Sequence, residues 1–346
     1  MFCKLTREDH RELVKLKGSV GNAIRDHMSQ TGAVESFYNK ITGGTGACEN
    51  IPTAFILQNT PQLSFLSQTD QLSMEAEILE FGIDAVWTVG RSFRNEPRAG
   101  DGRHLAEFAL LEYEARDMDL SGLVEFQQAL LNVVMETGLR SPIISSDHKE
   151  RLKRYLKTPA EVISYSDVIK RLNDGGVSIN WGDDFRSDIE EMVCLLFNGP
   201  VQVTHYPESI KFFNMHRTDR GRLEEGLPIE LYNRRRYTVE CVDFLLPWAG
   251  ETFGASRREE DYRTLTVKLR ESRMFKQMAK IRADQVGSGE VTDEIAKAAW
   301  EPFVPYLELF NPEKHPERKS VQRSGFGLGM GRLIQFVLGS TQVVPF

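Results

Sequence analysis

Hydrophobic residues near the N-terminus recur at the spacing of one helical face. Over residues 7–31 the recurring apolar positions are Leu13, Leu16, Val20, Ile24 and Met28. This spacing predicts a long amphipathic helix with one buried stripe. A second helix is predicted to begin near Asp70 or Gln71, after strand-like and turn-like residues from position 55 onward.

A pair of strand-like segments follows, over residues 84–94 and 105–116. The Pro- and Gly-containing stretch between them is a natural turn, so the two segments are predicted to form one long hairpin. The second segment is unusual because Glu107, Glu112 and Glu114 interrupt its apolar residues. A strand with this much charge indicates that something charged lies against it.

Blocks of helix and strand make up the rest of the chain. Helical stretches are predicted at 120–137, around 148–171, at 187–197 and at 259–281. Residues 201–258 are predicted to form strands separated by turns, one of them at 210–216, and residues 325–331 to form a Gly-rich turn before a last helix. Without repeats or a Pro/Ser-rich linker, this order predicts one α+β domain built around an antiparallel sheet.

Composition narrows the class of protein. The chain has 346 residues, 40% of them hydrophobic and 10% aromatic, which is enough for a large core. No apolar run approaches the roughly 20 residues of a membrane span, and no secretory signal precedes the first helix. A cytoplasmic protein with no membrane partner is therefore expected. The net charge of −7 argues against a surface built mainly for a nucleic-acid backbone.

The cysteines indicate no special chemistry. They are Cys3, Cys48, Cys194 and Cys241. They lie far apart along the chain, without a Cys-x-x-Cys pair, and so predict neither a zinc site nor a disulfide framework.

Two short clusters are candidates for phosphate binding. Arg94, Arg98 and Arg103 flank the hairpin turn, and guanidinium groups bind phosphate oxygens bidentately. The alternative is a solvated turn whose charges face water. In GFGLGMGRL, residues 325–333, small residues suit a close approach of the backbone and precede an arginine in the first turn of a helix. Packing alone is the alternative explanation of that motif.

A third cluster is a candidate metal site. Asp243 and Glu251 are separated by an apolar turn and are able to share one divalent ion, since Mg²⁺ takes carboxylate oxygens and usually bridges to phosphates. The alternative is that the two carboxylates balance Arg257 and Arg258.

These motifs, in this order, resemble the catalytic core of class II aminoacyl-tRNA synthetases. The matching stretches are FRNE…RHLAEF (93–108), VDFLLP…GETFGASRRE (242–259) and GFGLGMGRL (325–333). The likeness is to subclass IIb, above all to the archaeal type of asparaginyl enzyme, and runs from about residue 11 to the end. FLSQTDQLSMEAEI, WGDD and HYPESIKFFNM also agree with that family. The resemblance implies an antiparallel β-sheet flanked by helices that binds ATP.

The resemblance implies an ATP site made largely by the charged hairpin. The implied ATP contacts are Arg94, Glu96, Arg103, His104, Phe108 and Arg332. Arg94 would hold the α-phosphate and stabilise the charge that builds on it, and Arg332 would lie against the γ-phosphate and adenine, which makes both catalytic candidates. Glu96 would contact the adenine amino group and Phe108 would stack on the ring. Arg103 and His104 would touch the outer phosphates.

Two further sets of residues are implied by the same resemblance. The implied Mg²⁺ site is Asp243, Glu251 and Ser256, and the implied amino-acid contacts are Glu49, Gln71, Glu75 and Arg258. Aspartyl enzymes place a lysine after their QL motif, where this chain has Met74 followed by Glu75. Because an Arg–Glu pair offers both donors and an acceptor, asparagine or a close relative is favoured over aspartate. The alternative is that Glu75 simply pairs with Arg258.

Departures from the family pattern shape the expected function. The long helix begins almost at once, so no anticodon-binding OB domain is expected, and an insertion is expected at about 217–236. Asn39 and Gly331 stand where the family pattern has proline and glutamate. The chain is therefore expected to be a single catalytic domain over residues 1–346, from a paralogue that keeps its ATP and amino-acid contacts.

The expected activity is that of an AMP-forming ligase. The enzyme would activate asparagine or a close relative as an aminoacyl adenylate and pass the acyl group to a non-tRNA acceptor such as ammonia or an amine. One alternative is a true asparagine or aspartate tRNA ligase that works without its own anticodon domain. A second is a non-catalytic, synthetase-like regulator. A homodimer is compatible with the long first helix.

Overall fold

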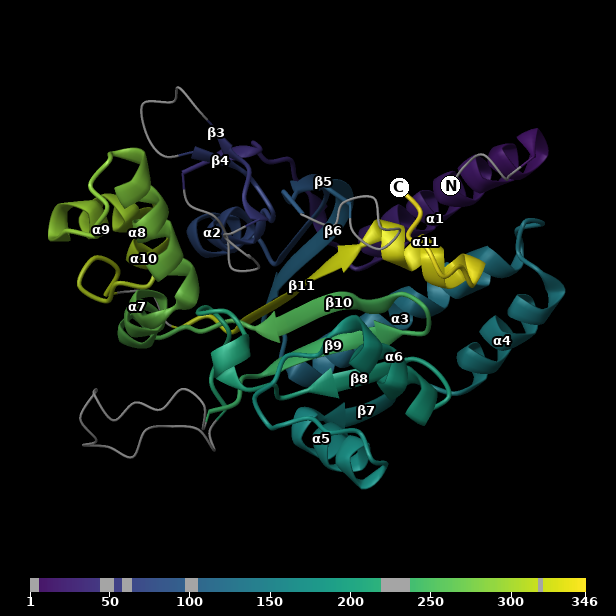
Figure 1. The fold of residues 1–346 in the computed structure, drawn as a ribbon. Helices are drawn as coiled ribbons and strands as arrows, with labels where there is room; N and C mark the ends of the chain where they lie inside the picture. The colour runs from purple at the N-terminus through teal and green to yellow at the C-terminus, as the bar shows by residue number, and fades with distance from the viewer. Residues whose placement is uncertain (1–5, 44–52, 58–63, 97–104, 219–236, 317–319) are drawn as a thin grey trace.

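A computed structural model describes residues 6–43, 53–57, 64–96, 105–218, 237–316 and 320–346. An eight-stranded sheet runs through these residues (Figure 1). Its strand order is β1 (Val34–Glu35), β5 (Ala85–Phe93), β6 (Glu107–Arg116), β11 (Arg323–Gly329), β10 (Gly250–Arg257), β9 (Cys241–Leu246), β8 (Val201–Thr204) and β7 (Glu161–Ser164). Neighbours from β5 to β8 are antiparallel, as the sequence predicts, while β1 and β7 pair in parallel at the two edges.

The second sheet is small. It consists of β2 (Ile41–Thr42), β4 (Ser64–Leu66) and β3 (Ile56–Leu57), in that order. Phe65 at the centre of β4 is fully buried in a cluster with the helices near the C-terminus. This sheet therefore connects the N-terminal third of the chain to those helices.

Two long helices cover one face of the large sheet. Helix α3 (Leu120–Leu139) packs across β9, β10 and β11, and α1 (Arg7–Gln30) packs against α3. The five predicted apolar positions of α1 are all buried. A capping box between Thr6 and Asp9 fixes the start of α1. Helices α4 (Ser146–Lys157) and α11 (Met330–Leu338) add side chains to the same core.

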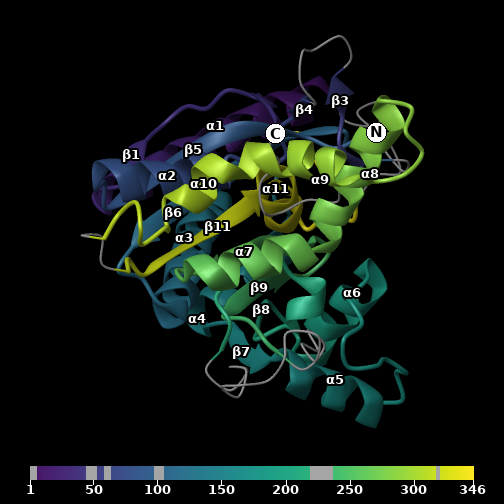
Figure 2. The same cartoon turned by 90° about the vertical axis from the view of Figure 1, so that its left-hand side faces the viewer.

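The remaining helices pack at the other face and at the edges. Helix α2 (Gln71–Phe81) lies on β5 and β6, and α5 (Tyr165–Asp174) and α6 (Ser187–Leu196) pack near β7, β8 and β9. A separate group contains α7 (Tyr262–Glu271), α8 (Arg273–Gln285), α9 (Asp293–Trp300), η7 (Glu301–Phe303) and α10 (Val304–Glu308). Figure 2 shows this group in front of the strands. No helix in the described part of the chain is long and apolar enough to cross a membrane.

Two predicted helical stretches are each divided in the structure. Residues 148–171 form part of α4, then β7 and part of α5, because Pro159 has no N–H to donate and holds Thr158 extended, at φ −129° and ψ 115°. Residues 259–281 divide at Ser272, whose extended backbone ends α7. Its side chain accepts a hydrogen bond from the Phe275 N–H and so caps the start of α8.

Two other local predictions are wrong. The Gly-rich motif forms strand β11 up to Gly329, because β6 and β10 pair with it on both sides and override the weak strand preference of glycine. The predicted strand at 210–216 is instead η3 (Glu208–Ile210) followed by irregular chain, with one bridge between Met215 and Arg258. The consecutive residues 209–213 all line one cavity, which an alternating strand does not allow.

Strand β6 places Glu112 and Glu114 on the same face. The side chains that pack into the core are Ala109, Leu111, Tyr113 and Ala115. The alternate side chains, Phe108, Leu110, Glu112 and Glu114, line a cavity on the opposite face. Period-two alternation therefore places both buried glutamates where a ligand is able to reach them. Glu112 and Glu114 therefore belong to a candidate site, whereas Glu107 is exposed to solvent.

Replacing Gly325 by alanine is expected to destabilise the fold by about 3 kcal/mol, because an added methyl group would overlap the Glu114 carboxyl and the Tyr113 carbonyl oxygen. Gly327→Ala, on the same strand, is the matched control. Its methyl group would meet only Leu110, at an ordinary 3.7 Å. Urea denaturation compares the two variants. Equal stabilities would contradict the close approach of β11 to β6 at Gly325.

Candidate active site

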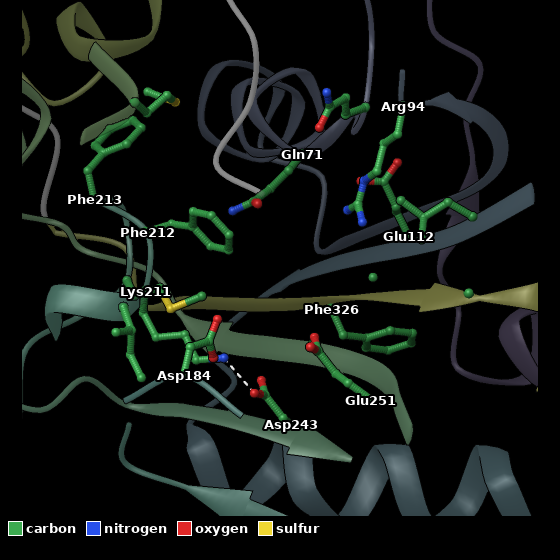
Figure 3. Close-up of a pocket in the computed structure, with 18 of the residues that line it drawn as sticks. Gln71, Arg94, Glu112, Asp184, Lys211, Phe212, Phe213, Asp243, Glu251 and Phe326 are labelled. Atoms are coloured by element: carbon green, nitrogen blue, oxygen red, sulfur yellow. Dashed lines mark hydrogen bonds and ion pairs between the residues drawn. The ribbon is translucent and has the colours of Figure 1, made fainter. Parts of the chain in front are cut away.

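One large cavity, of about 1040 Å³, lies on the Glu112 and Glu114 face of the sheet. Side chains from α2, from residues 209–215 and from α8 complete its walls (Figure 3). The predicted site residues that line it are Gln71, Arg94, Glu96, Phe108, Asp243, Glu251, Arg258 and Arg332. Glu49, Arg103 and His104 lie outside the described residues. The structure thus brings candidates from all three motifs to one place.

Arg94 reaches this cavity directly after β5 ends. Its backbone N–H donates to the Ala106 carbonyl oxygen at 2.8 Å, which continues the hairpin ladder beyond the strands. Its guanidinium carbon lies 5.3 Å from the centre of the Phe108 ring. The Nε atom is buried and has no hydrogen-bond partner within the described ranges. An unused buried donor at a cavity wall suits an anionic ligand from outside the chain.

Arg258 forms a buried ion pair that the sequence did not reveal. Its side chain contacts Glu114 through two hydrogen bonds, one of them 3.1 Å from Nε to Oε2. A third donor, Nη1, lies 2.6 Å from the Ser256 hydroxyl oxygen. Ser256, predicted beside the metal, therefore contacts Arg258 in this structure and is not part of the cavity lining. Burial raises the pKa of Glu114 to about 7, although Arg258 opposes this shift.

Glu75 is fully buried and is held from four directions. Its Oε1 accepts from Gln71 at 2.9 Å and from Asn214 at 3.0 Å. Its Oε2 accepts from Tyr306 at 2.9 Å and from Arg323 at 2.9 and 3.1 Å. Arg323 adjoins the Gly-rich motif, but its role was missed because nothing local to it indicates a partner in α2. The carboxylate joins α2, residue 214, α10 and β11.

The two buried ion pairs form one electrically balanced group. The nearest approach of Glu75 to Arg258 is 4.0 Å, so Arg258 is the weaker of its two arginine neighbours. Two glutamates, Glu75 and Glu114, face two arginines, Arg258 and Arg323. Because the charges cancel, this part of the site suits a neutral polar side chain better than a further charge.

Glu112 is another buried carboxylate, and like Glu114 it lines the cavity. It accepts from the Thr69 hydroxyl and, at 2.9 Å, from the Asp70 N–H, and Figure 3 shows it close to Arg94. Burial, together with the charge of Asp70, raises the pKa of Glu112 to about 8. The sequence showed this charge in the strand without assigning it a role. A buried carboxylate of this kind favours a cationic group beside it.

Raising the pH from about 5 to 8 is expected to lower the stability of the ligand-free protein. The pKa of Glu112 is about 8 when folded against an ordinary 4.5, so the folded state holds the proton more tightly and loses this stabilisation as pH rises. Each raised carboxylate contributes up to about 1.4 kcal/mol per pH unit. Urea denaturation of Glu112→Gln should show a shallower slope of unfolding free energy against pH. Glu107→Gln, exposed on the same strand, serves as the control, and equal slopes for both variants would contradict this assignment.

The candidate metal ligands lie on adjacent strands, at the opposite wall of the cavity from Arg94 in Figure 3. Asp243 comes from β9 and Glu251 from β10, and both line the cavity with Asp184. No group of three or more His, Cys, Asp or Glu side chains in the described ranges is arranged to hold a metal alone. Mg²⁺ commonly binds one or two carboxylates together with substrate phosphates. The Asp243–Glu251 pair therefore fits a Mg²⁺ ion that arrives with a phosphorylated ligand.

The first turn of α11 connects the Gly-rich motif to these carboxylates. Arg332 donates a hydrogen bond to the backbone carbonyl oxygen of Glu251. Its charge also faces Glu190, although burial still raises the pKa of Glu190 to about 7. Gly331 is required beside it, because a Cβ atom there would lie 2.9 Å from the Val344 carbonyl oxygen. The space that a side chain at position 331 would need is thus filled by Val343 and Val344, near the end of the chain.

Comparison with known proteins identifies the family of this chain. The family described as tRNA synthetases class II (D, K and N) matches residues 1–345. The chain belongs to this family. The asparagine–tRNA ligase of Thermococcus kodakarensis is 32% identical over 333 residues, which cover 94% of this chain and 65% of that protein. The Streptococcus mutans asparagine–tRNA ligase is 29% identical over 364 residues, covering 98% of this chain and 70% of that protein.

Solved structures of this synthetase family share the fold. Asparaginyl-tRNA synthetase from Pyrococcus horikoshii, complexed with asparaginyl-adenylate, superposes with a TM-score of 0.72 at 28% identity. That match covers 97% of this chain and 67% of the other. The class II synthetase fold predicted from the three motifs is therefore confirmed. The chain spans about two thirds of the length of the relatives it matches, and 65% of the length of the T. kodakarensis enzyme.

Proposed function

We propose that this chain activates asparagine, or a close relative, with ATP to form an aminoacyl adenylate and pyrophosphate. The observation that supports this most is the single cavity that gathers Arg94, Arg332 and Arg258 with the buried carboxylates. An archaeal relative of the same fold has been solved with asparaginyl-adenylate. Both points favour adenylate formation over a regulator without catalysis.

The cavity offers a side chain for each part of ATP that the proposed reaction involves. In the reaction, an amino-acid carboxylate oxygen attacks the α-phosphorus of ATP, and the bond to the pyrophosphate oxygen breaks. The unpartnered Nε of Arg94 is a fixed donor for the charge that develops on the α-phosphate. Phe108, on whose ring the Arg94 guanidinium lies, offers an aromatic surface for the adenine. Asp243 and Glu251 would hold Mg²⁺, which when bound neutralises phosphate charge.

The balance of charge supports an amide as the substrate side chain. Glu75 and Arg323 pair with each other, as do Glu114 and Arg258, so a neutral amide adds no unmatched charge. A carboxylate in the same place would leave one buried negative charge unpaired, which is costly. Arg258 lines the cavity while Glu75 does not, so we assign first contact with the side chain to Arg258.

We propose ammonia, a small amine or a carrier as the acyl acceptor. This follows from the departures at Gly331 and in the insertion of about 217–236. A tRNA acceptor is the second candidate, supported by relatives named asparagine–tRNA ligases. Adenylate formation is common to both, whereas transfer to tRNA is not.

Amino-acid-dependent exchange of labelled pyrophosphate into ATP tests the proposal. The assay uses purified protein, Mg²⁺ and each proteinogenic amino acid in turn, first without tRNA and then with total tRNA. Exchange dependent on asparagine is the expected result, and equal exchange with unrelated amino acids would contradict the pocket argument. No exchange with any amino acid, with or without tRNA, would favour the regulator. Preformed adenylate is then offered to total tRNA, ammonia and simple amines to identify the acceptor.

A further inference from the structure

Lys211 places a buried cation on one of the candidate metal ligands. Its Nζ lies 2.5 Å from Oδ2 of Asp243, and the side chains of both residues are less than a tenth exposed, at 8% and 6%. Figure 3 shows this contact at the wall of the cavity that also carries Asp184 and Glu251. The ammonium group also lies 4.1 Å from the centre of the Tyr206 ring. Lys211 lines the cavity, so its ammonium group is within reach of a ligand there.

The surrounding charges favour a cation at this position. Four carboxylates interact electrostatically here: Asp184, Glu190, Asp243 and Glu251. The facing cations are Lys211 and Arg332. The Lys211 ammonium group is paired with Asp243 at 2.5 Å and lies against the Tyr206 ring. Asp243 therefore already has a cationic partner before any metal arrives.

We propose that Lys211 occupies the position of the divalent ion in the nucleotide-free protein and makes metal binding conditional on nucleotide. This inference rests on the proposed use of ATP at this site. Free Mg²⁺ would have to displace Lys211 from Asp243 and would then lie beside a buried ammonium group of the same sign. ATP removes this obstacle, because its phosphates give Lys211 a new anionic partner within the cavity. Lys211 is thus a positioning residue for metal and phosphate.

Binding of Mn²⁺, followed by electron paramagnetic resonance, tests this without requiring activity. The wild-type protein is titrated with Mn²⁺ alone and with α,β-methylene-ATP present, whose own binding is measured by equilibrium dialysis. At least tenfold tighter binding of Mn²⁺ to the protein–nucleotide complex than to the free protein is expected, after subtraction of Mn²⁺ held by the nucleotide in solution. Equal affinity in both states would overturn the proposal. Failure of the analogue to bind at all would instead overturn the proposed use of ATP.

Substitutions of Lys211 and of a control lysine provide a second test by the same Mn²⁺ titration. Lys211→Met is expected to bind Mn²⁺ without nucleotide at least tenfold more tightly than wild type, because Asp243 is released. Lys280→Met, an exposed lysine of α8 at the cavity, is the control and should match wild type. Unchanged Mn²⁺ affinity in Lys211→Met would contradict the inference. Circular dichroism checks that Lys211→Met folds, and Lys211→Gln is used in its place if Lys211→Met does not fold. The comparison of wild-type protein with and without nucleotide decides the question even if neither variant folds.

Discussion

Replacing Arg94 by alanine is expected to reduce asparagine-dependent pyrophosphate exchange by about 10³-fold, the loss typical when a fixed donor to transition-state charge is removed. Stability should change little, since the buried Nε has no partner in the described structure that the substitution would leave unpaired. The exchange rate and the urea midpoint are measured on the same preparation. The drop should appear in the rate of the chemical step as well as in ATP affinity.

Arg91→Ala is the matched control for this prediction. Arg91 is exposed on β5, the strand that ends just before Arg94, and does not line the cavity. Its Nε lies 3.6 Å from Oε1 of Glu107. Its loss should leave exchange within about twofold of wild type, as for a surface ion pair of small energy. An Arg94→Ala variant that keeps nearly the full rate would show that ATP is placed elsewhere.

Replacing Arg258 by alanine should affect both folding and selectivity. Glu114 would be left buried without its main cationic partner, which is expected to cost about 3–5 kcal/mol of unfolding free energy. Amino-acid-dependent exchange should fall by at least about 10²-fold, because the site loses its donor to the substrate side chain. Binding of ATP, measured separately by equilibrium dialysis, should be affected less.

A double variant separates the two effects of Arg258. In Arg258→Met/Glu114→Gln both members of the ion pair are removed, so most of the lost stability should return. Exchange with asparagine should remain low, because the substrate contact is still missing. Recovery of exchange along with stability would mean that Arg258 acts only through the fold and does not meet the substrate.

Much of the architecture could be predicted because it depends on local periodicity. The stripe of α1, the hairpin of β5 and β6 and the start of α2 all follow from residue spacing. The strand character of β11 could not, since its glycines have weak preferences and the pairing comes from β6 and β10. The break before β7 is marked in the sequence by Pro159, which disfavours helical backbone at Thr158.

Residues of the candidate site could be predicted only where they belong to one of the three sequence motifs. Arg94 and Asp243 lie in the cavity because their motifs do. Glu114 and Arg258 are 144 residues apart, and Lys211 and Asp243 are 32 apart, so no local pattern indicates either pairing. The first contact depends on the register between strands and the second on where the chain after η3 lies on β9, and one sequence specifies neither. The roles of Glu49, Arg103 and His104 stay predictions, since these residues lie outside the described ranges.

The four-way attachment of Glu75 has an evolutionary consequence. An apolar replacement there deprives Arg323 of its counter-charge and removes hydrogen-bond acceptors for Tyr306 and Asn214. A descendant that came to prefer a different amino acid would therefore not arise by one step at this position. Compensating changes would have to accumulate first in α10 or β11, while still neutral. Under the proposed function, amino-acid preference thus depends on residues of α10 and β11 that do not line the cavity.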